Sequence, residues 1–444
     1  MQDWLRMSAA DLGRGIGAGQ IDPLDLTEAF LDAIAAHPDR DRIYSGMTIE
    51  RARAEARAAA GRARAGQRRG PLDGVPISWK DLFDSAGVAT EAGSALLKGR
   101  VPARDARVLR NATAAGLVCL GKTHMSELAF SGLGLNPVTA TPPNAHDPDA
   151  APGGSSSGAA VSVAFGLAAA GIGSDTGGSV RIPSAWNYLV GLKTTWGRLC
   201  NDGVVPLCAR FDTVGPLARS VEDAALLLAA LEGGRAADLR GVTAAGLRLA
   251  DLRTVVRDDL REAPAAAHEA ALTRLRAAGA AVEPLAVPEL PEAMGLSQAL
   301  FTGEAYGLWS DTIEAAPEKM FAPILERFRG GREVSTAQYV AAWWRLEALR
   351  AAWRRRVAGF DAVLLPTAPI LPPEVARLMQ DADYYATENL LTLRNTRVAN
   401  LMGLSAVTLP TGTPGCGLML LGRPMQEERL LRVARAAEAA LAAG

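Results

Sequence analysis

The 444-residue sequence is poor in cysteine and shows no cysteine pattern typical of a disulfide framework or a metal site. The four cysteines, Cys119, Cys200, Cys208 and Cys416, include no C-x-x-C pair. This spacing argues against disulfides and against a zinc site, and it favours a reducing compartment. We therefore expect a cytoplasmic protein that holds no metal.

The sequence also lacks an excess of charge of either sign and any long apolar run. Its 47 basic and 48 acidic residues leave a formal net charge of -1, so no overall field would attract nucleic acid or an anionic membrane surface. The longest apolar stretch, 159–173, is too short to span a membrane. An acid stands at position 3, where a signal peptide would be basic and then apolar. We expect a soluble protein without nucleic-acid or membrane partners.

What the sequence does contain is a composition suited to a compact core, 49% hydrophobic and 21% charged. Short apolar runs alternate with alanine-rich helical stretches, which predicts a mixed α/β fold around a buried sheet. We divide it into an N-terminal helical segment, a core with the candidate loops, a mainly helical and lid-like substrate-side region with one strand near 282–287, and the C-terminal part of the core. These regions are 1–66, 67–243, 244–359 and 360–444.

A long helix is expected at about 335–357, and it carries five arginines and the tryptophans Trp343, Trp344 and Trp353. Such a helix is an alternative candidate for a nucleic-acid-binding face. Because the net charge is close to zero, we favour a solvated arginine face with buried tryptophans.

Residues 116–123 match the phosphate-loop pattern G-x-x-x-x-G-K-[ST]. Four consecutive apolar residues fill the middle of the match, where a phosphate loop exposes backbone N–H groups. The segment therefore predicts a strand rather than a nucleotide site. Residues 175–177, Asp-Thr-Gly, resemble an aspartic-protease signature, but the second such triplet that the paired carboxylates require is missing.

Residues 154–158 satisfy G-x-S-x-G, the pattern of a nucleophile elbow, which would make Ser156 the nucleophile. That chemistry needs a histidine downstream. Only His268 follows, in an alanine-rich helical stretch where a partly exposed structural role is expected. The elbow hypothesis is therefore the weaker one.

Two segments rich in serine and glycine, 152–158 and 173–183, are stronger candidates for a site. Paired glycines free the backbone, and successive N–H groups that point into one concavity stabilise a developing oxyanion. Two ordinary surface loops remain the alternative. A third element, Lys80, ends an apolar strand-like run that begins near Val75. Burial there would lower the pKa of the lysine and make it a general base near neutral pH.

These segments together resemble the amidase signature family. The motifs Gly-Val-Pro-Ile-x-x-Lys-Asp, Gly-Lys-Thr-x-Met-x-Glu, Pro-Gly-Gly-Ser-Ser-x-Gly and Gly-Ser-Asp-Thr-Gly-Gly-Ser-x-Arg-x-Pro occur in family order, at 74–81, 121–127, 152–158 and 173–183. Weaker similarity extends the resemblance over most of the chain. The resemblance implies the family's α/β fold, a central mixed β-sheet covered by helices on both faces, and a serine hydrolase that cleaves amide bonds.

The resemblance also implies residue roles. Ser179 would be the nucleophile, Ser155 a bridging serine held by a cis peptide bond, and Lys80 the base. The backbone N–H groups of Thr176, Gly177, Gly178 and Ser179 would form the oxyanion hole. Asp175 and Arg181 would brace the glycine-rich loop, and neither a metal nor an organic cofactor is needed.

Within the family, segments 128–134 and 394–400 look more like stand-alone amidases than like the glutaminase subunit of the tRNA-dependent amidotransferase. The chain reads Gly-Cys-Gly-Leu-Met at 415–419, where many members have Pro-x-Gly-x-Gln. We expect a monomeric or homodimeric amidase for small amides, with esters or carbamates (urethanes) as further substrates. The glutaminase of the amidotransferase, and a catalytically inactive binding protein with the same fold, are the alternatives. Segment 128–141 and the helices after Ser297 are the expected walls of the pocket.

Overall fold

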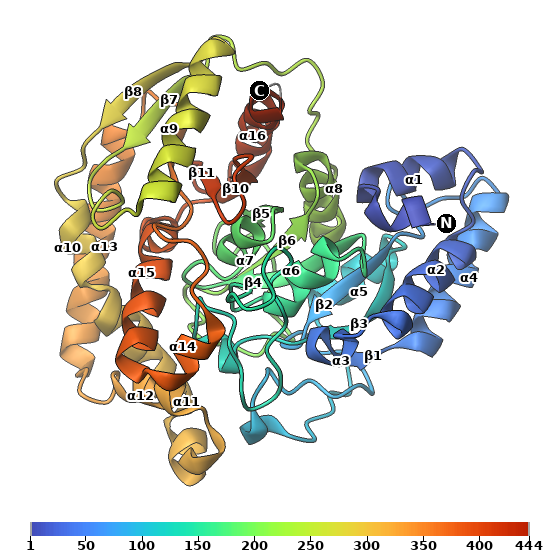
Figure 1. Cartoon of the computed structure of the whole chain (residues 1–444), viewed down its shortest axis with the longest axis horizontal. Coiled ribbons are helices and arrows are strands. Elements are labelled where there is room, and N and C mark those ends of the chain that lie inside the picture. Colours follow the sequence, from blue (N-terminus) through green and yellow to red (C-terminus); the bar gives the residue numbers. More distant parts are fainter. Residues whose placement is uncertain (1, 443–444) are drawn as a thin grey trace.

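The computed structural model describes residues 2–442, whose strands form one eleven-stranded sheet (Figure 1). The strands are β1 (Tyr44–Met47), β2 (Pro76–Lys80), β3 (Val118–Thr123), β4 (Ala170–Asp175), β5 (Val190–Lys193), β6 (Thr213–Ala218), β7 (Arg248–Leu252), β8 (Ala281–Leu285), β9 (Ala362–Pro366), β10 (Ala406–Pro410) and β11 (Gly417–Leu421). Their order across the sheet is β1-β3-β2-β4-β6-β5-β10-β11-β9-β7-β8.

The sheet is mixed, as the family resemblance implied. Strands β3, β2 and β4 are parallel neighbours, and so are β9, β7 and β8 at the other end. The strands between these two groups pair antiparallel. Parallel neighbours need long crossovers, which here are supplied mostly by helices. The carboxyl ends of β2 and β4 therefore meet at one edge of the sheet.

Helices cover both faces of this sheet, and this also confirms the fold class. They are α1 (Ala9–Gly17), α2 (Pro23–Ala36), α3 (Arg40–Ile43), α4 (Ile49–Arg64), α5 (Arg107–Ala114), α6 (Ser157–Ala164), α7 (Arg181–Trp186), α8 (Val221–Glu232), α9 (Glu262–Ala277), α10 (Leu290–Gly295), α11 (Gly303–Ala315), α12 (Ala322–Arg329), α13 (Thr336–Arg356), α14 (Val375–Gln380), α15 (Ala382–Leu401) and α16 (Glu427–Ala442). Short 3-10 or π turns, η1–η5, lie at Gln2–Arg6, Ala95–Leu97, Glu127–Ala129, Gln298–Thr302 and Pro317–Lys319.

One face carries a row of helices in which each contacts the next, α5, α8, α16 and α9. On the opposite face α6 contacts α7, and α7 contacts α15 (Figure 1). Helices α10 and α12 pack on α15, and α11, α12 and α13 all contact η4. This group lies beside the edge where β2 and β4 end, and it brings distant parts of the chain to that edge.

Helix α13 confirms only part of what its sequence predicted. Trp343 and Trp353 are buried, but Trp344 is 79% exposed, so the expectation that all three are buried was wrong for this residue. Trp344 directly follows a buried residue on a helix whose neighbours cover one face only, and it points to the other. The arginines of the helix are mostly solvated and pair with nearby glutamates, as Arg345 does with Glu292 at 2.5 Å.

Region 244–359 contributes β7 as well as β8, so the expectation of a single strand was too low. Both strands extend the central sheet through β9. None of the helices within residues 2–442 combines the length and apolar character needed to cross a membrane.

Candidate active site

Lys80 is the last residue of β2, and Ser174 and Asp175 are the last residues of the neighbouring parallel strand β4. The carboxyl ends of parallel strands are the usual position of a site in α/β sheets, because the chain turns there into loops and helices. In this structure the loop before α6 and the loop before α7 both return to that edge. The first carries Ser155 and the second carries Ser179.

The side chain of Lys80 is completely buried and lies among hydroxyl groups. Its Nζ donates hydrogen bonds to the Oγ of Ser155 and the Oγ of Ser174, each at 2.8 Å. Burial lowers the pKa of Lys80 to about 7, although the carboxylates of Asp212 and Asp175 oppose this shift. A substantial fraction of this lysine is therefore neutral near pH 7 and able to accept a proton.

The two serine-bearing loops contact each other through their backbones. The N–H of Ser156 donates to the carbonyl of Ser179 at 3.2 Å, and the N–H of Ser126 donates to the carbonyl of Ser155 at 3.2 Å. The Gly154–Ser155 peptide bond is cis. Within the described residues the Ser179 hydroxyl has no hydrogen-bond partner, and Ser179 lines a cavity. Its hydroxyl is therefore free to meet a ligand.

The turn before Ser179 leaves backbone donors unused. Among the described residues, the N–H groups of Gly177, Gly178 and Ser179 have no hydrogen-bond acceptor. The Oγ of Thr396 donates to the carbonyl of Gly177 at 2.7 Å, and a trans peptide points its N–H away from its carbonyl. The bond from Thr396 thus directs the N–H of Gly178 away from α15.

Gly178 itself cannot be replaced without strain. Its φ is +144°, and a Cβ at this position would lie 2.2 Å from the Oγ of Thr396. A glycine is needed because both the conformation and the close approach exclude a side chain.

Asp175 and Arg181 form a completely buried ion pair below this turn. The carboxylate accepts from the Nε and Nη2 of Arg181 at 2.9 and 2.8 Å, from the N–H of Val180 at 3.1 Å and from the Nδ2 of Asn400 at 3.0 Å. Despite desolvation, the charge and hydrogen bonds of Arg181 hold the pKa of Asp175 down at about 2. Arg181 also donates to the carbonyl of Thr396, which ties the turn to α15.

Asp212 is a site residue to which sequence reasoning gave no role. Its carboxylate accepts from the Thr176 hydroxyl at 2.5 Å and from the N–H groups of Leu207 and Cys208 at 2.9 and 3.1 Å. Burial raises its pKa to about 6, while these hydrogen bonds oppose that shift. Asp212 lies just before β6, so the antiparallel pairing of β6 with β4 explains its position.

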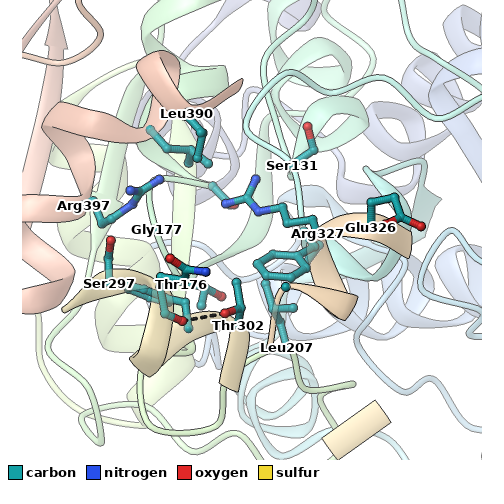
Figure 2. Close-up of a pocket in the computed structure, with 17 residues that line it drawn as sticks. Ser131, Thr176, Gly177, Leu207, Ser297, Thr302, Glu326, Arg327, Leu390 and Arg397 are labelled. Atoms are coloured by element: carbon teal, nitrogen blue, oxygen red, sulfur yellow. Dashed lines mark hydrogen bonds between the residues drawn. The ribbon is translucent and has the colours of Figure 1, made fainter. Parts of the chain in front are cut away.

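A cavity of about 370 Å³ opens beside Ser179, near the lower end of the range of about 300–1,000 Å³ for small-molecule sites. Figure 2 shows its lining, with side chains from both halves of the chain. The walls are Ala129, Phe130, Ser131, Thr176, Gly177, Ser179, Leu207, Ser297, Gln298, Phe301, Thr302, Glu326, Arg327, Gly330, Leu390, Leu393 and Arg397. Segment 128–141 supplies walls, and so do η4 and α12 in the helical region that follows Ser297, as expected. The contributions of α15 were not foreseen.

The phosphate-loop match at 116–123 is a strand, as predicted, because β3 occupies most of it. Its lysine, Lys122, is buried and donates to Asp81 at 3.1 Å and to the Thr90 hydroxyl at 2.9 Å. Neither the backbone nor the lysine is open to a nucleotide.

The elbow alternative also lacks its partners. The Oγ of Ser156 is buried and donates to the carbonyl of Ser174 at 3.3 Å. His268 is 1% exposed, so the expectation of partial exposure was wrong, while its structural role fits its contact with Asp251 at 3.0 Å. The histidine is buried because the face of α9 that carries it packs against the sheet. Within residues 2–442, no cluster of three or more His, Cys, Asp or Glu side chains is arranged to hold a metal ion.

The family model for amidases matches residues 25–431. A 2-amino-5-chloromuconic acid deaminase from Comamonas testosteroni is 36% identical over 458 residues, covering 99% of this chain and 98% of that protein. A glutamyl-tRNA(Gln) amidotransferase subunit from Anaeromyxobacter sp. (strain K) is 33% identical over 476 residues, covering 98% and 96%.

Among solved structures, one described as the crystal structure of an amidase matches with a TM-score of 0.87 and 31% identity, over 98% of this chain and 99% of that one. The native peptide amidase from Stenotrophomonas maltophilia matches with a TM-score of 0.80 and 30% identity, over 98% and 96%. Because the family model and these relatives span nearly the whole chain, the protein belongs to the amidase signature family and is an amide-hydrolysing enzyme of that family.

Proposed function

We propose that the protein hydrolyses the carbon–nitrogen bond of a small amide through an acyl-enzyme on Ser179, with Ser155 and Lys80 as the proton-transfer pair. The observation that carries the proposal is the 2.8 Å contact between the buried Nζ of Lys80 and the Ser155 hydroxyl. Ser179, whose hydroxyl is free, lies in the loop that contacts the Ser155 loop through its backbone. A relay of this kind makes a serine nucleophilic without a histidine.

In the first half-reaction neutral Lys80 accepts the proton of Ser155 as Ser155 accepts the proton of Ser179. The Ser179 oxygen then bonds to the carbonyl carbon of the substrate. The N–H groups of Thr176, Gly177, Gly178 and Ser179 would hold the resulting oxyanion. Donors fixed in this way act without reorganisation, and the loss of one costs roughly 100-fold or more in rate.

Collapse of the tetrahedral intermediate breaks the carbon–nitrogen bond. Ser155 gives its proton to the leaving nitrogen and regains one from Lys80. Water then attacks the acyl-enzyme and loses a proton through the same pair. The acid leaves, and Ser179 is restored with its proton. Asp175 and Arg181 take no part in these transfers and brace the turn that carries the donors.

The same chemistry extends to esters and carbamates, because the oxyanion site binds the carbonyl oxygen whatever atom leaves. We include both as side activities in the proposal. Region 244–359 is proposed to act as the substrate side of the enzyme. Its support is that Ser297, Phe301 and Arg327 line the cavity together with Ser179.

The test is hydrolysis of p-nitroanilides and p-nitrophenyl esters by the wild type, Ser179→Ala, Lys80→Ala and Ser156→Ala, with mass spectrometry of the trapped acyl adduct. We expect Ser179→Ala and Lys80→Ala to lower turnover by roughly 10³-fold or more, with the adduct on Ser179. Ser156→Ala tests the alternative nucleophile. Activity that survives Ser179→Ala and disappears with Ser156→Ala would overturn the proposal.

A glutaminase subunit of an amidotransferase is the second candidate, and the 33% identity to the Anaeromyxobacter protein supports it. The two functions differ in substrate and in partners. Release of ammonia from glutamine by the isolated chain, stimulated by partner proteins, would favour the amidotransferase. Turnover of several unrelated small amides without partners would favour the stand-alone enzyme.

A further inference from the structure

Two arginines face each other in the cavity beside Ser179. Arg327 projects from α12 and Arg397 from α15, and Figure 2 shows their guanidinium groups pointing toward each other across the cavity. They are 70 positions apart in the sequence, and only the packing of α12 on α15 brings them together. The cavity therefore presents two positive charges to whatever enters it.

Neither charge is neutralised by the described part of the protein. Arg327 and Arg397 make no ion pair and no hydrogen bond there, whereas Arg329, also on α12, pairs with Glu314 at 2.8 Å. The Nη1 of Arg327 is buried without a partner. The guanidinium carbon of Arg327 lies over the ring of Phe130, 4.4 Å from its centroid.

The acidic side chains near the cavity do not neutralise the charges of Arg327 and Arg397. Glu326 also lines the cavity, but it is exposed and lies 3.3 Å from Arg329. Glu127 accepts from the N–H of Phe321 and from the hydroxyl of Ser94. An arginine pair that is partly buried and has no ionic partner is costly, and such pairs are found where an anion binds.

Burial lowers the pKa of Arg327 to about 10. Burial and, secondarily, the charge of Arg327 lower the pKa of Arg397 to about 9. Both values stay above 7, so both side chains remain cationic at neutral pH. Their mutual repulsion is relieved when an anion lies between them.

We infer that Arg327 and Arg397 bind a carboxylate on the acyl part of the substrate, so that the enzyme acts on half-amides of dicarboxylic acids. This rests on the proposed function, because the acyl part is defined by attack from Ser179. The leaving nitrogen must face Ser155, its proton donor, and Ser155 is not part of the cavity wall. The cavity, with Thr176, Gly177 and both arginines, therefore receives the acyl chain.

The test compares glutaramate with pentanamide, which have the same chain length and differ by a carboxylate in place of a methyl group. Ammonia release gives kcat/KM for each in the wild type, Arg327→Gln, Arg397→Gln and the control Arg329→Gln. We expect the wild type to prefer glutaramate. Each cavity substitution should lower the preference ratio by roughly 10- to 100-fold, and Arg329→Gln should retain it. Arg327→Lys and Arg397→Lys, which keep the charge, should retain more of the ratio than the Gln variants.

A binding measurement separates this inference from the proposed function. Calorimetry with Ser179→Ala and glutaramate reports binding without turnover, and the arginine substitutions are repeated in that background. Equal kcat/KM for the two amides in the wild type would overturn the inference and leave the hydrolase intact. If neither amide is hydrolysed, binding that depends on both arginines still supports the inference. Absence of glutaramate binding overturns it.

Discussion

The Nζ of Lys80 lies 2.8 Å from the Oγ of Ser155, and both side chains are completely buried. Burial disfavours the ammonium ion, so the pKa of this lysine falls from its ordinary value of 10.5 to about 7. Near pH 7 a substantial fraction of Lys80 is therefore neutral and able to accept the proton of the Ser155 hydroxyl. The pH dependence of the reaction follows from it.

We predict that kcat/KM for a neutral amide rises as the pH increases through about 7 and levels off above it. Lys80 must lose its proton before it can accept one from Ser155, so the activity belongs to the deprotonated form. The measurement is a profile of kcat/KM from pH 5 to 10 with the wild type. The exposed Lys98 provides the control, since Lys98→Ala should give the same profile. A flat profile over this range would contradict the role of Lys80.

Asp212 should influence the pH at which kcat/KM reaches half of its maximum, the midpoint of this profile. Its negative charge stabilises the ammonium form of Lys80, so Asp212→Asn should move the midpoint to lower pH by about one unit. Asparagine keeps an acceptor for the Thr176 hydroxyl, which limits the disturbance of the loop. The midpoint is read from the same profile, and the melting temperature checks the fold. A shift to higher pH would show that Asp212 acts on some other group.

The Asp175–Arg181 pair should govern stability rather than proton transfer. Arg181→Met leaves a buried carboxylate without its cation, and we expect a loss of about 3–5 kcal/mol in the free energy of unfolding at pH 7. Asp175→Asn together with Arg181→Met should be less destabilised than Arg181→Met alone. Urea unfolding measures each variant. Additive losses in the double variant would show that the two residues do not act as a pair.

The same pair fixes how stability changes in acid. The folded pKa of Asp175, about 2, lies below its ordinary value of 3.8, so the folded protein binds its proton more weakly than the unfolded chain. The contribution to stability is present above pH 4 and is lost as the pH falls toward 2. Asp175→Asn should therefore show a flatter loss of stability over this window than the wild type.

Thr396 is predicted to position the oxyanion donors. Thr396→Val removes the hydrogen bond to the Gly177 carbonyl and frees the peptide that carries the N–H of Gly178. We expect kcat to fall by roughly 10-fold or more, with a small change in KM. The midpoint of the pH profile should stay in place, since Lys80 is untouched, and Thr396→Ser should restore most of the rate. A change confined to KM would argue for a role in binding instead.

The segments that carry Lys80, Ser155 and Ser179 could be singled out because each is continuous in the sequence and carries a dense motif. The fold class followed from alternating apolar runs and helical stretches. Strand β4 was not predicted, because its sequence, Ala-Gly-Ile-Gly-Ser-Asp, has the small residues of a loop. The structure supplies the reason: a Cβ on Gly171 would lie 2.7 Å from the carbonyl oxygen of Ala159, so α6 packs directly on the strand.

The remaining parts of the site depend on tertiary contacts that no local pattern encodes. Thr396 meets Gly177 across 219 positions, and Arg327 has no distinguishing neighbours in the sequence. Segment 394–400 was singled out only for its resemblance to stand-alone amidases. Its spacing of Thr396 and Asn400, one helical turn apart, is the signal that would have placed both side chains on one face of a helix.

Arg327 is predicted to lower the stability of the folded protein while it contributes to substrate binding. A desolvated cation without an ionic partner lowers the stability of the folded state, and residues kept for binding often carry such a cost. Arg327→Met removes the charge and keeps a contact with the Phe130 ring through its sulfur. We expect its melting temperature to rise by roughly 2 °C while the preference for glutaramate falls.

The matched control is Arg329→Met, on the same helix. It breaks the ion pair with Glu314 and should lower the melting temperature slightly or leave it unchanged. Added glutarate should raise the melting temperature of the wild type more than that of Arg327→Met, because only the wild type has both cations to be neutralised. A fall in the melting temperature of Arg327→Met, together with an equal response to glutarate, would mean that the arginine serves packing alone.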